Sequence, residues 1–206
     1  EKKTENWNAF LSAQAQIFTK EVGELKGSIM KAGQMLSMYG EYFFPPEVNQ
    51  FLKSLQQDSP ALKWEAIEPL IRQYLGDEKY AELEIDHEAL ACASLGQVHR
   101  ATIKKTGEQI VLKIQYPQVD KAIDSDLRAI RSFIQMIKIL PKEFDLDPVF
   151  SEIKTMLTQE SDYEQEALKT EEFKSKLNND PRYIVPTVYH QYSSKKILAT
   201  SFESGL

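Results

Sequence analysis

Cysteine is nearly absent from this sequence, and so are the metal-ligand patterns that often accompany it. The chain of 206 residues contains a single cysteine, Cys92, so no internal disulfide can form and a reducing compartment fits. Its histidines, His87, His99 and His190, follow none of the usual zinc-ligand spacings, and one cysteine cannot complete such a site. The sequence therefore argues against a disulfide-stapled secreted module and against a structural zinc domain.

The sequence also has no excess of positive charge and no long apolar run. The 25 Lys and Arg residues against 31 Asp and Glu residues give a net charge of −6, so no overall basic field favours nucleic acid as a partner. No apolar run approaches the ~18–20 residues that span a bilayer, and the first residues lack the apolar core of a signal peptide. We expect a bacterial cytoplasm, including its membrane periphery, while a mitochondrial matrix or a plastid also fits.

The composition of 42% apolar and 27% charged residues is enough for one medium domain or two small ones, with helical spacing in the first third and strand patterns after residue 80. The expected helices span residues 6–38, 46–57, 64–75, 118–140 and 146–178. The expected strands span residues 83–85, 97–103, 109–116, 185–191 and 196–202. This pattern predicts an α+β fold with a helical N-terminal segment, 1–78, and a sheet-bearing segment, 79–206.

Glycines interrupt one face of the first expected helix. Gly23, Gly27, Lys31 and Gln34 share the face opposite the apolar seam, where each interior glycine costs an exposed helix about 1 kcal/mol relative to alanine. Either another segment packs closely on this face, or the face is solvated and simply tolerates its glycines.

Small residues fill the segment that joins two of the expected strands. They allow backbone N–H groups to approach a phosphate without obstruction by side chains. The segment lacks the usual glycine spacing, so a simple tight hairpin is the competing interpretation. The candidate phosphate-contacting residues are Ala91, Cys92, Ala93, Ser94, Leu95, Gly96, Gln97 and Val98.

Lys113 supports the phosphate interpretation. The period of two along a strand places it on the face opposite Ile110, Leu112 and Ile114, one hairpin after the small-residue segment. Protein kinases bring a lysine under the phosphates of a nucleotide by the same order of elements. The competing interpretation is an ordinary solvated lysine.

An acidic partner for Lys113 is expected on the helix that follows residue 146. Glu160 interrupts an apolar stripe there, and a buried carboxylate needs a cation, so loss of Lys113 is predicted to cost about 3 kcal/mol or more. Asp162 and Glu166 project from the other side of an ideal helix, so they can serve the same cation only if the helix bends. Lys31 is the expected second cation. Alternatively, Glu160 lies at a helix edge and reaches water.

Four short motifs occur along the chain in a fixed order. They are Lys31-Ala32-Gly33-Gln34, the alanine-rich run 91–101, the lysine strand 111–117 and the acidic run 160–167. Together they resemble the KxGQ signature, alanine-rich loop, nucleotide-lysine strand and ExD helix of the UbiB-like, or aarF-domain, atypical protein-kinase-like family. The resemblance covers nearly all of the chain from about residue 20. The proline usual before the alanine-rich run is absent, since Glu88-Ala89-Leu90 stands there.

The resemblance implies a kinase-like N-terminal lobe, with a small antiparallel sheet, preceded by a helical KxGQ extension that folds over the site. It implies that Lys113 binds the phosphates of ATP or ADP and pairs with Glu160, while the alanine-rich loop covers the phosphates. Lys31 and Gln34 are expected to reach toward the helix that carries Glu160, Asp162 and Glu166. Magnesium is the implied metal.

The sequence ends before any catalytic-loop Asp and Asn or metal-binding Asp, which phosphoryl transfer requires. We therefore expect the C-terminal lobe and the magnesium ligands in a longer parent chain, and no turnover by this fragment alone. The resemblance implies an ATP-binding part of an atypical kinase or ATPase supporting ubiquinone biosynthesis, with quinone-biosynthesis proteins or lipid-like molecules as partners. The alternatives are a pseudokinase-like regulatory module that binds nucleotide without chemistry, and a helical interaction domain that binds none.

Overall fold

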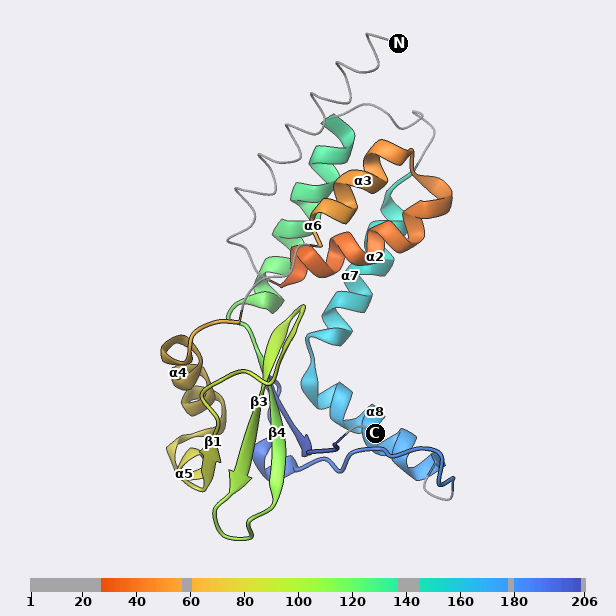
Figure 1. Ribbon diagram of the computed structural model, residues 1–206. Coiled ribbons are helices and arrows are strands. Elements are labelled where there is room, and N and C mark those ends of the chain that lie inside the picture. The colour runs from red at the N-terminus through yellow and green to blue at the C-terminus, as the bar shows by residue number, and fades with distance from the viewer. Residues whose placement is uncertain (1–26, 57–60, 137–144, 178–179, 205–206) are drawn as a thin grey trace. The chain divides into compact units, whose positions relative to one another are not determined.

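The computed structural model describes residues 27–56, 61–136, 145–177 and 180–204 (Figure 1). Its helices are α2 (Ser28–Phe43), α3 (Pro46–Ser54), α4 (Trp64–Leu75), α5 (Asp77–Ala81), α6 (Val119–Met136), α7 (Asp147–Glu160) and α8 (Tyr163–Leu177), with a 3-10 turn at His190–Tyr192. Its strands are β1 (Leu83–Ile85), β2 (Ala91–Ala93), β3 (Gly96–Ile103), β4 (Gln109–Gln115) and β5 (Ile197–Ser201). The mixed α+β class is confirmed. The helix predicted from residue 6 lies outside the described residues as far as residue 26.

The chain forms two compact units, and each is built from two separate segments. Unit 1 comprises Glu1–Ser59 and Gln118–Thr158, and unit 2 comprises Pro60–Pro117 and Gln159–Leu206. These units divide the chain differently from the predicted segments 1–78 and 79–206. Helices α4 and α5 fall in the unit that contains the sheet, because their apolar residues cover it, whereas α6 and nearly all of α7 join the first helices.

Unit 1 is a helical cluster of α2, α3, α6 and α7 around one apolar core. Gly33 lies at the contact between α2 and α3, where an added Cβ would stand 2.8 Å from Leu55 Cβ and 3.1 Å from the Leu52 carbonyl oxygen. Gly27 precedes α2 with a φ of 106°, a conformation that favours glycine, so its role is to begin the helix. The close packing of this helix is thus at Gly33, which lies off the predicted face of Gly23, Gly27, Lys31 and Gln34. On that face Gln34 is exposed, Gly27 precedes the helix, and Gly23 lies outside the described residues.

The first turn of α2 is capped by an acidic residue of α6. The hydroxyl of Ser28 and the backbone N–H of Ile29 both donate to the carboxylate of Asp126, which is 4% exposed. Burial raises the pKa of Asp126, while these two hydrogen bonds oppose the rise. Since the carboxylate supplies the acceptors that a helix N-terminus lacks, it fixes α2 against α6.

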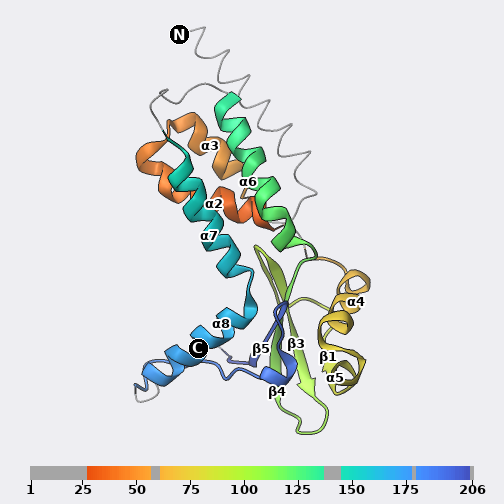
Figure 2. The same ribbon diagram turned by 180° about the vertical axis from the view of Figure 1, so that it is seen from behind.

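Unit 2 contains an antiparallel sheet with the order β1-β3-β4-β5, and β2 pairs with the other end of β3. One face packs against α4 through Ile67 and Ile71, which meet the apolar strand residues in a single cluster. The opposite face meets α8 in a smaller cluster of Tyr163, Ala167, Val188 and Leu198. Figure 2 shows β5 beside β4, with α8 adjoining this end of the sheet. The sheet is thus covered by different helices on its two faces.

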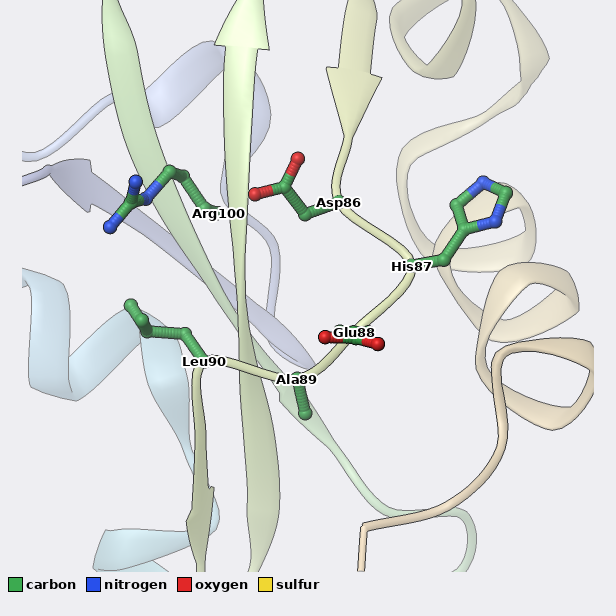
Figure 3. Close-up of a pocket in the computed structure, with 6 residues that line it drawn as sticks. All are labelled: Asp86, His87, Glu88, Ala89, Leu90 and Arg100. Atoms are coloured by element: carbon green, nitrogen blue, oxygen red, sulfur yellow. The ribbon is translucent and has the colours of Figure 1, made fainter.

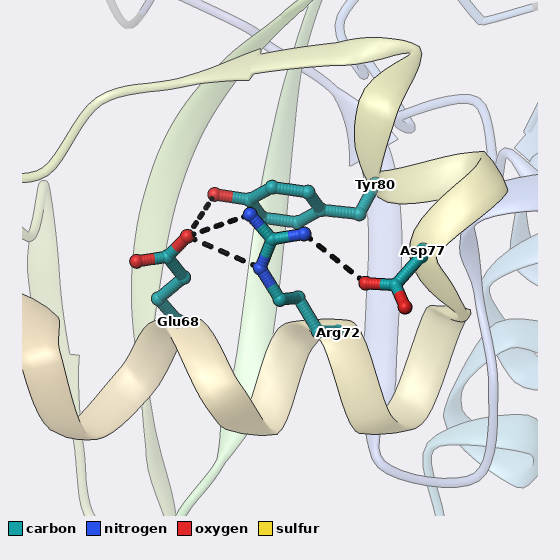
Figure 4. A network of polar contacts seen from close by, with 4 residues as sticks. All are labelled: Glu68, Arg72, Asp77 and Tyr80. Atoms are coloured by element: carbon teal, nitrogen blue, oxygen red, sulfur yellow. Dashed lines mark hydrogen bonds and ion pairs between the residues drawn. The ribbon is translucent and has the colours of Figure 1, made fainter.

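A polar network fastens the short helix α5 to α4 (Figure 4). Arg72 pairs with Glu68 at 2.9 Å and with Asp77 at 3.1 Å, and its guanidinium lies 3.8 Å from the centre of the Tyr80 ring. The Tyr80 hydroxyl donates to Glu68, which lowers the pKa of that carboxyl together with Arg72. This network explains how α5, which has no buried residue, is held in place.

Two predicted elements differ from the structure. The helix expected over 146–178 is broken at Ser161 and Asp162, which separate α7 from α8. The strand expected over 185–191 is reduced to a bridge between Val188 and Thr200 followed by the 3-10 turn. Within the described residues, none of the helices combines the length and the apolar character needed to cross a membrane.

Candidate functional site

Lys113 lies on the face of β4 that turns away from the main core of unit 2. Ile110, Leu112 and Ile114 are fully buried on the α4 side, so the predicted alternation of this strand is confirmed. Its cross-strand neighbours are Val98 on β3 and Leu198 on β5. Because directly opposed residues share a face, Lys113 points to the side of the sheet covered by α8.

The ammonium group of Lys113 is held by a carboxylate and an aromatic ring. Its Nζ donates to Glu166 Oε1 at 2.6 Å and to Oε2 at 2.7 Å, and it lies 4.7 Å from the centre of the Tyr163 ring. The side chains are 29% exposed for Lys113 and 36% for Glu166, so water and ligands can reach the pair. Burial raises the pKa of Tyr163, and the charge of Glu166 adds to the rise. The lysine is therefore oriented and accessible.

The predicted partner of Lys113 was wrong. The structure pairs the lysine with Glu166 and not with Glu160, which ends α7 as a half-buried residue. The prediction assumed one continuous helix, in which Glu160 and Glu166 face different directions. The break after Glu160 changes the direction of the chain, so the carboxylate in the first turn of α8 reaches the lysine.

Asp162 begins the second helix as its cap. Its Oδ1 accepts from the backbone N–H groups of Glu164 and Gln165 at 3.2 and 3.3 Å, and its Oδ2 lies 3.8 Å from Lys195 Nζ. Aspartate followed three residues later by glutamine is a capping signal that the sequence already carried. This signal predicts a new helix at Tyr163 and would have identified Glu166 as the partner of Lys113.

A buried glutamine holds the helix break against the sheet. Gln115, which is 0% exposed, donates from Nε2 to the Ser161 carbonyl at 2.7 Å and accepts at Oε1 from Lys196 Nζ at 2.5 Å. It stands at the end of the strand that carries Lys113. The same strand therefore positions both members of the ion pair, a role of Gln115 that no local sequence pattern predicts.

The small-residue segment forms a tight hairpin between β2 and β3. Ala91 pairs with Val98 and Ala93 with Gly96, with Ser94 and Leu95 in the turn. Because Val98 also stands opposite Lys113, Ala91 shares the face of the lysine. The Leu95 carbonyl accepts from the Tyr116 N–H at 3.0 Å, which fastens the turn to the end of β4.

Gly96 allows this hairpin to lie close to the lysine strand. An added Cβ would stand 2.2 Å from the Ile114 carbonyl oxygen and 3.1 Å from the Tyr163 hydroxyl. Since the nearest obstacle is backbone, no side-chain movement could relieve the contact. Gly96 is therefore required for the approach of β3, β4 and α8 at this point.

Cys92 and Gln97 form a cross-strand pair on the other face of the sheet. Burial raises the pKa of the Tyr116 hydroxyl to about 12, and the neighbouring Cys92 contributes in the same direction. Gln97 is buried, and its side chain accepts from the Leu62 N–H at 2.8 Å. Gln97 of the predicted phosphate segment thus contacts the structure behind the sheet, whereas Cys92 is exposed.

His99 continues the polar network of Gln97 behind the sheet. Its Nδ1 donates to the Asp86 carbonyl at 2.8 Å, and its Nε2 accepts from Gln97 Nε2 at 2.8 Å. Burial lowers the pKa of His99, which keeps the ring neutral and suits this donor and acceptor pattern. The network fastens the segment that leads into α4 to strand β3.

The residues of the first motif lie on α2 in unit 1. Lys31 is half-buried, Gln34 is exposed, and Gly33 is the contact with α3 described above. Their predicted approach to the helix that carries Glu160, Asp162 and Glu166 stays a prediction. Within unit 2, by contrast, the structure brings Lys113, Glu166 and Tyr163 together beside the glycine that closes the hairpin.

This arrangement is suited to an anionic ligand. An accessible ammonium group, fixed by a carboxylate beside a hairpin of small residues, can contact phosphate oxygens as a point charge. No group of three or more His, Cys, Asp or Glu side chains in the described parts of the chain could hold a metal ion. The site can therefore bind and orient phosphates through the residues of unit 2.

Comparison with known protein families gives one match over most of the chain. The profile of the ABC1 atypical kinase-like domain matches residues 54–206. Curated relatives include the atypical kinase COQ8 of Saccharomyces cerevisiae, 31% identical over 97% of this chain and 40% of the relative. COQ8 of Schizosaccharomyces pombe is 31% identical over 93% of this chain and 32% of its own length. The chain thus spans less than half of either relative.

A solved structure shows the same fold. The complex of Rv3197 with erythromycin from Mycobacterium tuberculosis matches all of this chain and 52% of that chain. The TM-score is 0.59 and the sequence identity is 30%. The structural match covers the whole of this chain, and the sequence matches to the two COQ8 proteins cover 93% and 97% of it.

Proposed function

Because this chain belongs to the ABC1 atypical kinase-like family, we propose that it is the nucleotide-binding part of an atypical kinase or ATPase. Family membership confirms the resemblance to UbiB-like proteins, and a kinase-like family implies nucleotide binding. The resemblance also supports a role in isoprenoid quinone biosynthesis. Unit 2 then corresponds to the N-terminal lobe of a kinase, and α2 carries the KxGQ extension of the family.

The observation that carries this proposal is the ion pair between Lys113 and Glu166 beside the hairpin closed by Gly96. Lys113 binds nucleotide phosphates, and Glu166 with the Tyr163 ring fixes the direction of its ammonium group. The hairpin that includes Ala91 and Ala93 covers the phosphates. The resemblance to the family supports a contribution of Lys31 and Gln34 of α2 to nucleotide binding, and Asp162 positions α8 as its N-terminal cap.

Magnesium is the metal that this function implies. The resemblance to the kinase-like family supports magnesium ligands in a C-terminal lobe, which is the location proposed for them here. The metal would neutralise phosphate charge during transfer of the phosphoryl group. The residues of this chain bind and orient the nucleotide.

The test is thermal unfolding of the protein in its longest natural form, with Mg-ATP or Mg-ADP. We expect saturating nucleotide to raise the midpoint by several degrees, because a ligand that binds only the folded state stabilises it. The Lys113→Ala variant should lose this shift, while Lys105→Ala, in the exposed hairpin of the same sheet, should keep it. The absence of a shift in the natural protein, or an equal shift in Lys113→Ala, would contradict the proposal.

A second measurement separates an enzyme from a regulatory module. We expect the natural protein to release ADP from ATP and the Lys113→Ala variant to release none. Binding without turnover would support the pseudokinase-like alternative while leaving the nucleotide site intact.

A further inference from the structure

A pocket of about 520 Å³ lies where β1 leads into β2, and the kinase-like site described above does not account for its walls (Figure 3). Its lining residues are Asp86, His87, Glu88, Ala89, Leu90 and Arg100. Figure 3 shows Arg100 and Leu90 on one side of the strands and His87 on the other. His87 stacks on Trp64 at 4.3 Å between ring centres. The stacked His87 is thus held by α4, while Arg100 and Leu90 line the other side of the pocket.

Arg100 is arranged to contact a further group. Its guanidinium carbon lies 4.1 Å from the centre of the Phe202 ring, which fixes one face of the guanidinium. Its Nε is buried and has no hydrogen-bond partner among the described residues. A planar cation with unused donors readily stacks on, or donates to, an aromatic heterocycle.

The register of the sheet places Arg100 on the same face as Lys113. Val98 stands opposite Lys113, and Arg100 stands opposite Val111. Each of these cross-strand pairs forms one row across the face, and the two rows are neighbours. A strand rises about 3.3 Å per residue, which separates the rows by roughly 7 Å, about the span of a ribose between phosphate and base. Val98 and Val111 are half-buried. They provide an apolar surface between the two cations.

The carboxylates of the pocket decide which end of a nucleotide meets Arg100. Asp86 and Glu88 are exposed residues of the same pocket and repel the negatively charged phosphates. Lys113, beside the hairpin of small residues, attracts these phosphates at the other row. This distribution of charge favours an orientation in which the phosphates of a nucleotide lie at Lys113 and its uncharged base lies toward Arg100.

We propose that Arg100, held by Phe202, contacts the base of the bound nucleotide and contributes to the affinity of this chain for nucleotides over phosphates alone. The inference rests on the proposed nucleotide-binding function. Arg100 stacks on the base or donates to its ring nitrogens, and Val98 and Val111 pack against its apolar surface. Base recognition by this site thus comes partly from the sheet itself.

The experiment compares binding of Mg-ATP with binding of magnesium tripolyphosphate, which has no base, by calorimetry on the longest natural form. We expect Arg100→Leu to weaken ATP about tenfold, as for loss of a desolvated cation–π contact, and to leave tripolyphosphate unchanged. Lys113→Ala should weaken both ligands. The control Arg128→Leu changes an exposed arginine of α6 and should affect neither.

Each outcome decides between the two proposals. Unchanged ATP binding by Arg100→Leu, or an equal loss for both ligands, would overturn the role of Arg100 and leave the nucleotide site standing. ATP bound no more tightly than tripolyphosphate by the natural protein would do the same. If the natural protein binds neither ligand, the proposed function itself fails and the role of Arg100 falls with it. Should Arg100→Leu unfold, Phe202→Leu replaces it, with the same selective loss of ATP affinity expected.

Discussion

Lys113 shows how two neighbouring groups change the role of an ordinary strand lysine. Glu166 and the Tyr163 ring fix the direction of its ammonium group, yet both members of the ion pair remain partly exposed. The sequence suggested a buried pair whose disruption costs about 3 kcal/mol or more. For a pair with this exposure, we expect about 1 kcal/mol.

A double-mutant cycle tests which carboxylate pairs with the lysine. We expect Lys113→Ala and Glu166→Ala to show a coupling of roughly 0.5–1 kcal/mol in the free energy of unfolding, because the two side chains share two hydrogen bonds. The cycle with Glu160→Ala should give a coupling near zero. Urea unfolding measures both, and a larger coupling with Glu160 would refute the geometry.

Gly96 provides a second prediction for a single residue. Gly96→Ala should destabilise the protein by about 2–3 kcal/mol, since the new Cβ would overlap the Ile114 carbonyl and force two strands apart. Cys92→Ala, an exposed change in the same hairpin, should alter the unfolding free energy by less than about 0.5 kcal/mol. Equal stability of the two variants in urea would show that the sheet yields easily at this position.

At the level of elements, the sequence predicted β3 and β4 well but missed the break between α7 and α8. Apolar residues alternate with Lys113 along β4 because successive side chains of a strand point to opposite faces of the sheet. This pattern alone predicts the face on which Lys113 lies. The break contains neither glycine nor proline, and the apolar stripe continues across it into Tyr163. Only the capping pattern of Asp162 marks it, while the tie from Gln115 depends on tertiary structure.

Gln115 is predicted to position the helix break and, through it, Glu166. Gln115→Leu removes the amide donor to the buried Ser161 carbonyl, so we expect a loss of about 1–3 kcal/mol in unfolding free energy and weaker nucleotide-induced stabilisation. Gln109→Leu, at the exposed start of the same strand, serves as the matched control. Thermal unfolding with and without Mg-ATP measures both effects. Similar behaviour of the two variants would contradict a positioning role.

The network behind β3 predicts a dependence of stability on pH. Because burial lowers the pKa of His99 in the folded state, the unfolded chain binds the proton more tightly. The stability that His99 contributes is therefore complete above about pH 6.5 and declines as the pH falls below this unfolded value. Urea unfolding at several pH values should show this slope in the natural protein and a smaller slope in His99→Gln. Identical slopes would exclude His99 as the cause.

At the level of the whole molecule, the two units have separate apolar cores. Gly33→Leu should therefore disturb unit 1, because its side chain would overlap Leu55 and the backbone of α3. Hydrogen exchange should become faster in α2 and α3 and remain unchanged in the sheet of unit 2. Equally faster exchange in β3 and β4 would show that the two cores unfold together.

The complete site could not be deduced from this chain by local patterns. Lys113, Gly96 and the hairpin are predictable because they follow one another closely in sequence. The position of Lys31 and Gln34 relative to them depends on the arrangement of two units, which periodicity does not encode. The curated relatives are also longer, since this chain spans 32–40% of the two yeast COQ8 proteins.

The division of unit 1 into two segments has a consequence for the order of folding. Lys113 and Glu166 are 53 residues apart, and the chain between them includes α6 and α7. Closing a flexible loop of that length costs roughly 3.5 kcal/mol in chain entropy, more than the ion pair returns. The pair can therefore persist only after α6 and α7 have condensed and shortened the effective loop. The ion pair between Lys113 and Glu166 should thus form late in folding. Its formation would indicate that α6 and α7 have already folded.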